Sequence, residues 1–149
     1  MNATNLALGQ RVPSMSLTCA DSLPRTIAAP GTSQLVTFAT VSDCAACEAH
    51  MSGLETLAKA GALPVETMVV FWAPRADVAR ALRLMRSSIA RPLCRDEHDS
   101  LWIRLDITHT PVTALIRDGR IALLDDGPLF SPVEQRLFAD RVRRLSVDR

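Results

Sequence analysis

The fold is decided at residues 35–51, which have the sequence LVTFATVSDCAACEAHM. Residues 35–40 are rich in β-branched and aromatic side chains, and this composition predicts a buried strand. Residues 41–43 follow with two side chains that commonly cap helices, a serine and an aspartate. We therefore expect the strand to lead directly into a helix over about residues 44–60, ended by Gly61.

A second apolar run at residues 67–72 predicts another buried strand after this helix. A strand, a long helical crossover and a second strand form a βαβ unit, whose two strands are parallel neighbours. A later helix is expected to begin at residues 74–77. The apolar stripes of the two helices are predicted to be Cys47, Met51, Leu54 and Ala58 in the first, and Val78, Ala81, Leu82 and Met85 in the second.

The rest of the chain predicts a hairpin and a final helix after shorter elements. The expected elements are a weak strand at 14–19 within an N-terminal hairpin, a short strand at 92–94, a brief helix around 101–105, strands at 112–116 and 121–124 joined by Asp118-Gly119, and a helix opened by Ser131-Pro132 with Val133, Leu137, Val142 and Leu145 on one side. The order of elements predicts one α/β domain over residues 1–149, with an N-terminal β extension (1–34) and a core (35–149). In the core, helices are expected to flank a central mixed sheet, and the fold includes a βα-type insertion.

Composition excludes several classes of protein. The net charge of +1 gives no electrostatic footprint for nucleic acid. With 48% hydrophobic and 22% charged residues, the chain is neither a disordered tail nor a membrane bundle. No apolar stretch approaches the roughly 20 residues of a membrane span, and no leader peptide is visible. As written the chain is expected in the cytoplasm, or in the periplasm if a signal or anchor has been removed.

Cys44 and Cys47 lie at the strand-to-helix junction and are separated by two residues. Unpaired N–H groups and the macrodipole at a helix N-terminus favour negative charge, so Cys44 at the first helical position would carry a stabilised thiolate. A thiolate is the nucleophile of thiol–disulfide exchange, and Cys47, one turn further along, lies where it can break the mixed disulfide. The spacing therefore predicts a redox-active cysteine pair.

Two other interpretations of these cysteines remain open, inert thiols and a metal site. A zinc site needs a second pair of ligands, and Cys94 and His98 have a C-x3-H spacing. The 46 residues between Cys47 and Cys94 are unlike the usual short zinc spacings, so no metal is expected.

Three segments together resemble the TlpA/ResA-type thioredoxin-like thiol–disulfide oxidoreductases, within the AhpC/TSA-like thioredoxin-fold group. They are Cys44 to Ala58, against a family pattern of C-x-x-C-x-x-E-x-P and an apolar helix; Thr110-Pro111-Val112-Thr113, against G-T-P-T; and Ile116 to Ile121, against I-D-x-D-G-x-I. The resemblance implies a thioredoxin fold in which Pro111 is cis and faces the cysteine pair. It also implies that the backbone at Thr110 pairs with an extended substrate, and that the protein exchanges dithiols and disulfides with protein partners without a bound cofactor.

Departures from the family pattern fall close to the cysteines. Asp43 stands where the family usually has tryptophan, and its carboxylate either opposes a thiolate on Cys44 or caps the helix. The buried acid of thioredoxin falls at Phe38. His50 occupies the position of the family's glutamate, and two interpretations stand beside each other, a proton shuttle for Cys47 or a packed helix histidine.

The two remaining cysteines, Cys19 and Cys94, are expected to be separate buried thiols, since a disulfide between them cannot be derived from spacing. Trp72 and Trp102 are expected in the core.

The sequence thus predicts thiol–disulfide exchange with protein disulfide or dithiol substrates, the pair being restored by an upstream redox partner. Cys44 attacks, Cys47 resolves the mixed disulfide, and Thr110 with Pro111 shapes the substrate groove. The alternatives are a non-catalytic thioredoxin-like accessory or maturation protein of the methylamine-dehydrogenase kind, and the metal-binding domain described above.

Overall fold

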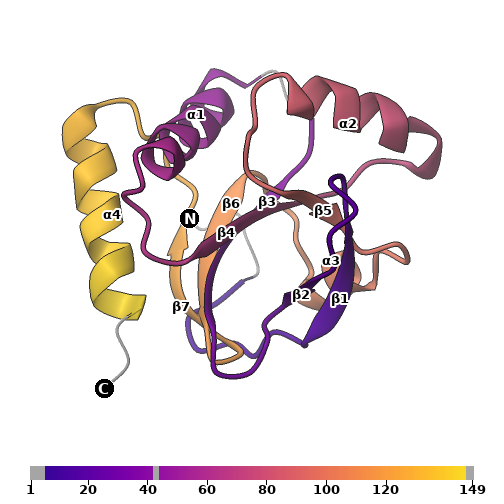
Figure 1. Ribbon diagram of the computed structural model, residues 1–149, viewed down its shortest axis with the longest axis horizontal. Coiled ribbons are helices and arrows are strands. Elements are labelled where there is room, and N and C mark those ends of the chain that lie inside the picture. Colours follow the sequence, from indigo (N-terminus) through magenta and orange to yellow (C-terminus); the bar gives the residue numbers. More distant parts are fainter. Residues whose placement is uncertain (1–5, 42–43, 147–149) are drawn as a thin grey trace.

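The computed structural model describes residues 6–41 and 44–146, which build one curled seven-stranded sheet with helices on both faces (Figure 1). The strands are β1 (Met15–Cys19), β2 (Arg25–Ile27), β3 (Ser33–Ala39), β4 (Glu66–Phe71), β5 (Leu93–Arg95), β6 (Val112–Arg117) and β7 (Arg120–Asp125), in the order β2-β1-β5-β4-β3-β6-β7. The helices are α1 (Ala45–Lys59), the short 3-10 turn η1 (Arg75–Asp77), α2 (Val78–Arg86), α3 (Ser100–Leu105) and α4 (Pro132–Ser146).

Strand β3 lies in the interior of the sheet, between β4 and β6, and leads the chain into α1. It runs parallel to β4, as the βαβ pattern predicts, and antiparallel to β6. β6 and β7 form the expected hairpin around Asp118 and Gly119, both of which have positive φ. The mixed sheet flanked by helices confirms the predicted α/β class and thioredoxin fold.

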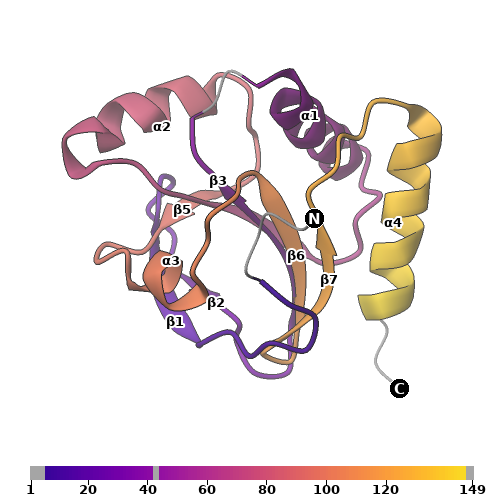
Figure 2. The ribbon, with the colours of Figure 1, turned by 180° about the vertical axis from the view of Figure 1, so that it is seen from behind.

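The two faces of the sheet are covered by different helices (Figures 1 and 2). On one face, α1 and α4 pack over β3, β6 and β7, and α2 packs over the end of β3 with β4 and β5. On the other face, α3 and the N-terminal segment cover a cluster that includes Phe38 and Trp102, whose rings meet edge to face at 5.9 Å. The chain thereby buries apolar side chains on both sides of its central strands.

Two of the predicted apolar stripes are only partly correct, because Leu54 in the first and Val142 in the last are buried as expected but the other members are not. Helix α1 buries His50, Gly53, Leu54, Glu55 and Leu57, so its inward face lies one position away from the expected stripe. Helix α4 buries Phe138, Ala139 and Val142, whereas Val133 and Leu137 are exposed. The stripe of α2 is confirmed, because Ala81 and Met85 are buried there.

The two tryptophans also differ from one another. Trp102 is buried in the cluster on the α3 face, as expected. Trp72 directly follows β4 and is 38% exposed, so the prediction that it belongs to the core is wrong. The apolar run that continues through Trp72 gave no indication that the strand ends at Phe71.

The prediction of two separate thiols is also wrong, because Cys19 and Cys94 form a disulfide. β1 pairs antiparallel with β5, and this register places Cys19 directly opposite Cys94. Both cysteines are buried. Since the two strands share only two registered pairs, the disulfide is the strongest link between the N-terminal hairpin and β5.

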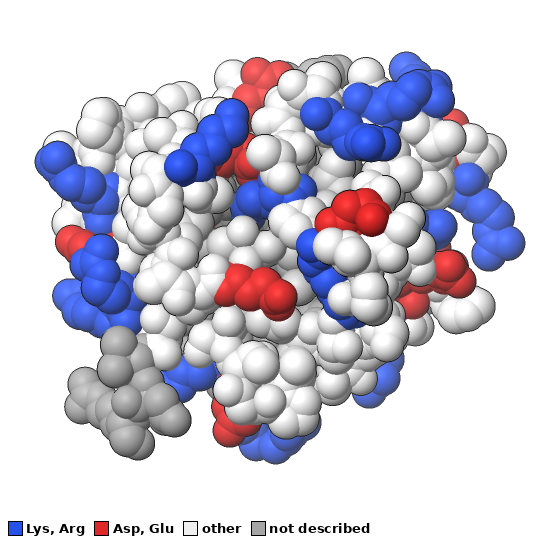
Figure 3. Space-filling model, in the orientation of Figure 1, with Lys and Arg blue, Asp and Glu red and all other residues white. Residues whose placement is uncertain are grey.

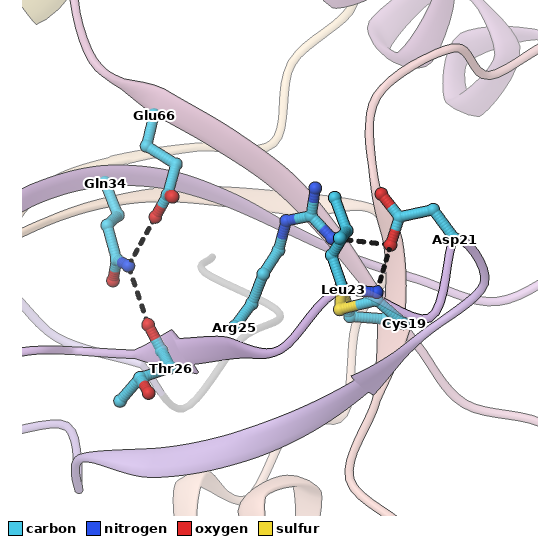
Figure 4. Close-up of a disulfide and its surroundings, with 8 residues drawn as sticks. Cys19, Asp21, Leu23, Arg25, Thr26, Gln34 and Glu66 are labelled. Carbon is cyan, nitrogen blue, oxygen red and sulfur yellow. Dashed lines mark hydrogen bonds and ion pairs between the residues drawn. A yellow bond between two sulfur atoms is a disulfide. The ribbon is translucent and has the colours of Figure 1, made fainter.

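Polar contacts around the disulfide hold the same hairpin in place (Figure 4). Arg25 donates to the Asp21 carboxylate at 2.7 Å across the β1–β2 connection. Gln34 at the start of β3 donates to the carbonyl oxygen of Thr26 at 2.8 Å and to Glu66 at 2.7 Å. The sheet thus curls until its edge strand β2 lies against the first residues of β3.

Candidate active site

Cys44 is the N-cap residue of α1, so the helix begins one residue later than the sequence suggests. Its sulfur accepts a hydrogen bond from the backbone N–H of Cys47 at 3.3 Å, and its side chain is exposed. The hydrogen bond from the Cys47 thiol lowers the pKa of the Cys44 thiol, and the backbone N–H of Cys47 lowers it further. Ser42 and Asp43, the two cap residues that the sequence suggests, lie outside the described residues.

Cys47 points from the first turn of α1 toward the strand that enters the hairpin. The Thr110–Pro111 peptide bond is cis. The Cys47 sulfur also lies 3.9 Å from the carbonyl oxygen of Thr110, so the single proton of this thiol is donated either to that oxygen or to the Cys44 sulfur. The hydroxyls of Thr110 and Thr40 lie 3.0 Å apart and join the end of β3 to the same segment. The fold therefore brings the Cys44 and Cys47 pair next to Thr110 and Pro111, which lie more than sixty residues later in the sequence.

A groove of about 740 Å³ opens beside Cys47 and Pro111, between α1 and α2. Its walls are mostly apolar, with Met51 and Ala49 on the α1 side and Leu84, Met85 and Ile89 on the α2 side. Basic side chains gather over α2, where Arg80, Arg83 and Arg86 are exposed (Figure 3). A protein segment that approaches Cys44 would meet a mostly apolar groove, and the exposed arginines of α2 do not belong to its lining.

His50 lies one turn after Cys47 and is completely buried. Its Nδ1 is 2.6 Å from the carbonyl oxygen of Gly127, and its Nε2 is 2.8 Å from the hydroxyl oxygen of Thr113. Burial lowers the pKa of the His50 imidazole, and nearby Arg91 lowers it too, although Gly127 and Asp125 act in the opposite direction. The ring thus faces the sheet, and its role as a proton shuttle for Cys47 stays a prediction.

A buried ion pair lies further along the same side of α1, and sequence reasoning missed it. Arg91 donates from Nε to the Glu55 carboxylate and from Nη1 to the Thr37 hydroxyl at 3.1 Å. The other Glu55 oxygen accepts from the backbone N–H groups of Ala90 and Arg91. A glutamate at the centre of an otherwise apolar helical turn was the available sign, because a buried carboxylate requires a partner.

The position of thioredoxin's buried acid is apolar here, as the sequence indicates. Phe38 is 1% exposed and packs against Trp102 on the face of the sheet away from α1. No carboxylate takes its place on β3, and the Cys47 sulfur instead faces the carbonyl oxygen of Thr110.

The metal-site alternative is wrong for the predicted ligands. The Cys94 sulfur is bonded to Cys19, so it is not available to a metal ion together with Cys44, Cys47 and His98. Within residues 6–41 and 44–146, no group of three or more histidine, cysteine, aspartate or glutamate side chains is arranged to hold a metal ion. The same residues contain no helix that is long and apolar enough to cross a membrane.

Comparison with solved structures finds the same fold in several thiol–disulfide oxidoreductases. No family model matches the sequence, and no curated protein sequence matches it either. A thio-disulfide isomerase from Thermus thermophilus is similar, with a TM-score of 0.69 and 23% identity over 97% of this chain and 100% of that chain. StoA from Bacillus subtilis has a TM-score of 0.67 and 15% identity, over 91% of this chain and 97% of that chain.

The thioredoxin domain of a thiol–disulfide oxidoreductase from Bacteroides vulgatus is also similar, with a TM-score of 0.64 and 15% identity over 91% of this chain and 97% of that chain. Identities this low show a shared fold. The expected structural resemblance to thioredoxin-like thiol–disulfide oxidoreductases is thereby confirmed.

Proposed function

We propose that the protein is a thiol–disulfide oxidoreductase that exchanges the Cys44–Cys47 dithiol or disulfide with protein substrates. The observation that carries the proposal is the placement of Cys44. It is exposed at the N-cap of α1, and hydrogen bonds from the thiol and backbone N–H of Cys47 lower its pKa. Such a thiol supplies the nucleophile that disulfide exchange requires.

The exchange consists of two displacements. In the reducing direction, the Cys44 thiolate attacks one sulfur of a substrate disulfide and releases the other sulfur as a thiolate, which takes a proton from water. Cys47 loses its proton and attacks Cys44, which forms the Cys44–Cys47 disulfide and releases the second substrate thiolate. The substrate gains the two electrons that the cysteine pair loses. The reverse sequence oxidises a substrate dithiol, and an upstream redox partner restores the pair in either case.

Thr110 and Pro111 bind the substrate in this proposal. Pro111 borders the groove next to Cys47, and the segment before β6 presents backbone to anything that lies over Cys44. An extended substrate segment can pair with the backbone at Thr110, since added strands use main-chain hydrogen bonds for affinity. The apolar walls of Met51 and Met85 then favour substrates with an apolar side chain close to the reacting cysteine.

The disulfide between Cys19 and Cys94 supports an oxidising compartment as the place of action. Glutathione and thioredoxin keep most thiols reduced in the cytosol, whereas disulfides persist in the periplasm and outside the cell. We propose that this protein works in such a compartment. This replaces the cytoplasmic location favoured by the sequence as written.

The test is a redox titration of the purified protein in glutathione buffers, with thiol counting and metal analysis. The wild type is expected to show one reversible two-electron couple, which Cys44→Ser abolishes. Cys47→Ser is the matched variant, since it keeps the attacking thiol and should accumulate a stable mixed disulfide with a model protein substrate. A pair that never oxidises, or stoichiometric zinc, overturns the proposal. A reversible couple without exchange would instead favour the non-catalytic accessory protein.

A further inference from the structure

A chain of hydrogen bonds crosses the sheet beneath α1. It runs from the Glu55 carboxylate to Arg91, from Arg91 Nη1 to the Thr37 hydroxyl at 3.1 Å, and from Thr37 to the Thr113 hydroxyl at 2.8 Å. Thr113 then meets Nε2 of His50 at 2.8 Å. All five side chains are buried. On this face of the sheet they lie between the apolar cluster under α1 and α4 and the one under α2.

The donors and acceptors fix the direction of every bond in the chain. The carbonyl oxygen of Gly127 can only accept a hydrogen bond. Nδ1 of His50 therefore carries a proton and donates to that oxygen. Neutral His50 then accepts at Nε2 from the Thr113 hydroxyl. Arg91 can only donate, so the Thr37 hydroxyl accepts from it and donates onward to Thr113. Each hydroxyl gives one hydrogen bond and receives one, and the chain is consistent only in this direction.

One bond of this chain joins the two elements that carry the candidate site. His50 follows Cys47 by three residues and therefore lies on the same side of α1, one turn further in. Thr113 is the second residue of β6 and follows the cis Thr110–Pro111 segment by two residues. No sheet hydrogen bond can connect a helix to a strand, so the Thr113–His50 bond supplies a direct polar link between them just behind Cys47.

We propose that Thr113 is a positioning residue for the resolving cysteine: its hydroxyl, bonded to His50, holds the Cys47 turn of α1 against the cis Thr110–Pro111 segment. This inference rests on the proposed function, because Cys47 is taken to attack the mixed disulfide formed on Cys44. Without the bond, α1 can shift on the sheet, and Cys47 reaches the correct line of attack less often.

The test compares two isosteric changes at equally buried threonines. Thr113→Val removes the link between α1 and β6, whereas Thr37→Val removes a hydroxyl whose partners are Thr113 on the paired strand β6 and Arg91, neither of which lies in α1. Thr113→Ser keeps the hydroxyl. Each reduced protein is mixed rapidly with one equivalent of dithionitrobenzoate, a chromogenic aromatic disulfide. The first coloured thiolate reports attack by Cys44, and the second reports resolution by Cys47.

Thr113→Val is expected to slow the second phase about tenfold, the factor that corresponds to one lost buried hydrogen bond, and to leave the first phase within about twofold. Thr113→Ser should restore the second phase, and Thr37→Val should retain it. The proposal is overturned if Thr113→Val resolves at the wild-type rate, or if Thr37→Val slows resolution equally.

A second measurement separates this inference from the proposed function. If the wild-type protein performs no thiol–disulfide exchange at all, the proposed function fails. The role of the Thr113–His50 bond is then still tested by amide hydrogen exchange in α1. Thr113→Val should then expose the amides around Cys47 and His50 to faster exchange than Thr37→Val does. Equal amide hydrogen exchange in the two variants would overturn the positioning role of Thr113.

Discussion

The acid side of the stability curve should depend on His50. The imidazole is completely buried and neutral, and burial is the largest cause that lowers its pKa. The charged groups around it act in both directions. The guanidinium of Arg91 opposes protonation, whereas the carboxylates of Asp125, 3.9 Å from Nδ1, and of Asp126 favour it. Arg141 lies 3.5 Å from the same Asp125 carboxylate and offsets part of its charge. The balance is a lowered pKa in the folded protein.

The sign of the effect follows from proton binding. An unfolded histidine has a pKa of about 6.5, so below this pH the unfolded chain binds a proton that the folded chain does not. The contribution of His50 to stability is therefore fully present above about pH 6.5 and is lost as the pH falls toward the folded pKa. Within that window, the free energy of unfolding decreases by up to about 1.4 kcal/mol per pH unit on account of this one group.

Urea unfolding of the wild type and of His50→Gln at several values between about pH 5 and 8 measures the effect. Glutamine does not titrate, so the stability difference between the two proteins should narrow by about 1 kcal/mol per pH unit on the acid side. His98→Gln is the matched control, because His98 is exposed, and its curve should run parallel to that of the wild type. Parallel curves for His50→Gln and the wild type would refute the argument.

Three further substitutions test the packing around the site. Replacing Cys19 and Cys94 together by alanine should lower stability by about 4 kcal/mol, because their disulfide closes a loop of 75 residues; unfolding with and without reductant measures this, and unchanged stability would contradict it. Gly53→Ala should lower the stability by about 1 kcal/mol in thermal unfolding, because the new Cβ would lie 2.5 Å from Cβ and 2.9 Å from the backbone oxygen of Leu129. This clash of about 1–3 kcal/mol outweighs the gain in helix propensity of about 1 kcal/mol. A rise in Tm would contradict the expectation. Arg91→Met should cost about 3 kcal/mol or more by leaving the carboxylate of Glu55 buried and unpaired, and adding Glu55→Leu should recover most of it in urea unfolding; no recovery would contradict this.

The sequence predicted the fold correctly because its main pattern is local and strong. An apolar strand, a cysteine pair at the start of a helix and a second apolar strand define a βαβ unit, and its handedness and neighbours follow from general rules. The hairpin around Asp118 and Gly119 depends on a turn that requires positive φ at both positions. The conformation of such elements is determined by a few consecutive residues, so it can be predicted from the sequence.

The buried face of α1 could not be predicted in the same way. Hydrophobicity favours a stripe through Cys47, Met51 and Leu54, but the buried residues of the helix include the polar side chains of His50 and Glu55. These two polar side chains are buried because Thr113 and Arg91, which lie far away in the sequence, satisfy them with hydrogen bonds. The apolar side of the helix is left to line the groove beside Cys47. Periodicity in one helix cannot reveal partners on other strands.

The disulfide escaped prediction for a related reason. Whether Cys19 and Cys94 meet depends on the register between β1 and β5, which are short strands with weak alternation. A slip of one residue would turn the two sulfurs to opposite faces of the sheet. That register is set by the whole curled sheet, including the contacts of Gln34 with Thr26, and no spacing rule encodes it.

The two cysteine pairs differ in exposure, and under the proposed function this difference would let one chain carry both a structural disulfide and a redox-active pair. Exchange requires a thiolate to approach a sulfur in line with the bond that breaks, so access to the sulfur controls the rate. Cys19 and Cys94 are 6% and 0% exposed within the sheet, whereas Cys44 is exposed at the helix N-terminus. A substrate thiolate therefore reaches Cys44 without local unfolding, while attack on the Cys19–Cys94 bond requires β1 to separate from β5. Under the proposed function, the Cys19–Cys94 disulfide and the Cys44–Cys47 pair would therefore coexist without exchanging partners.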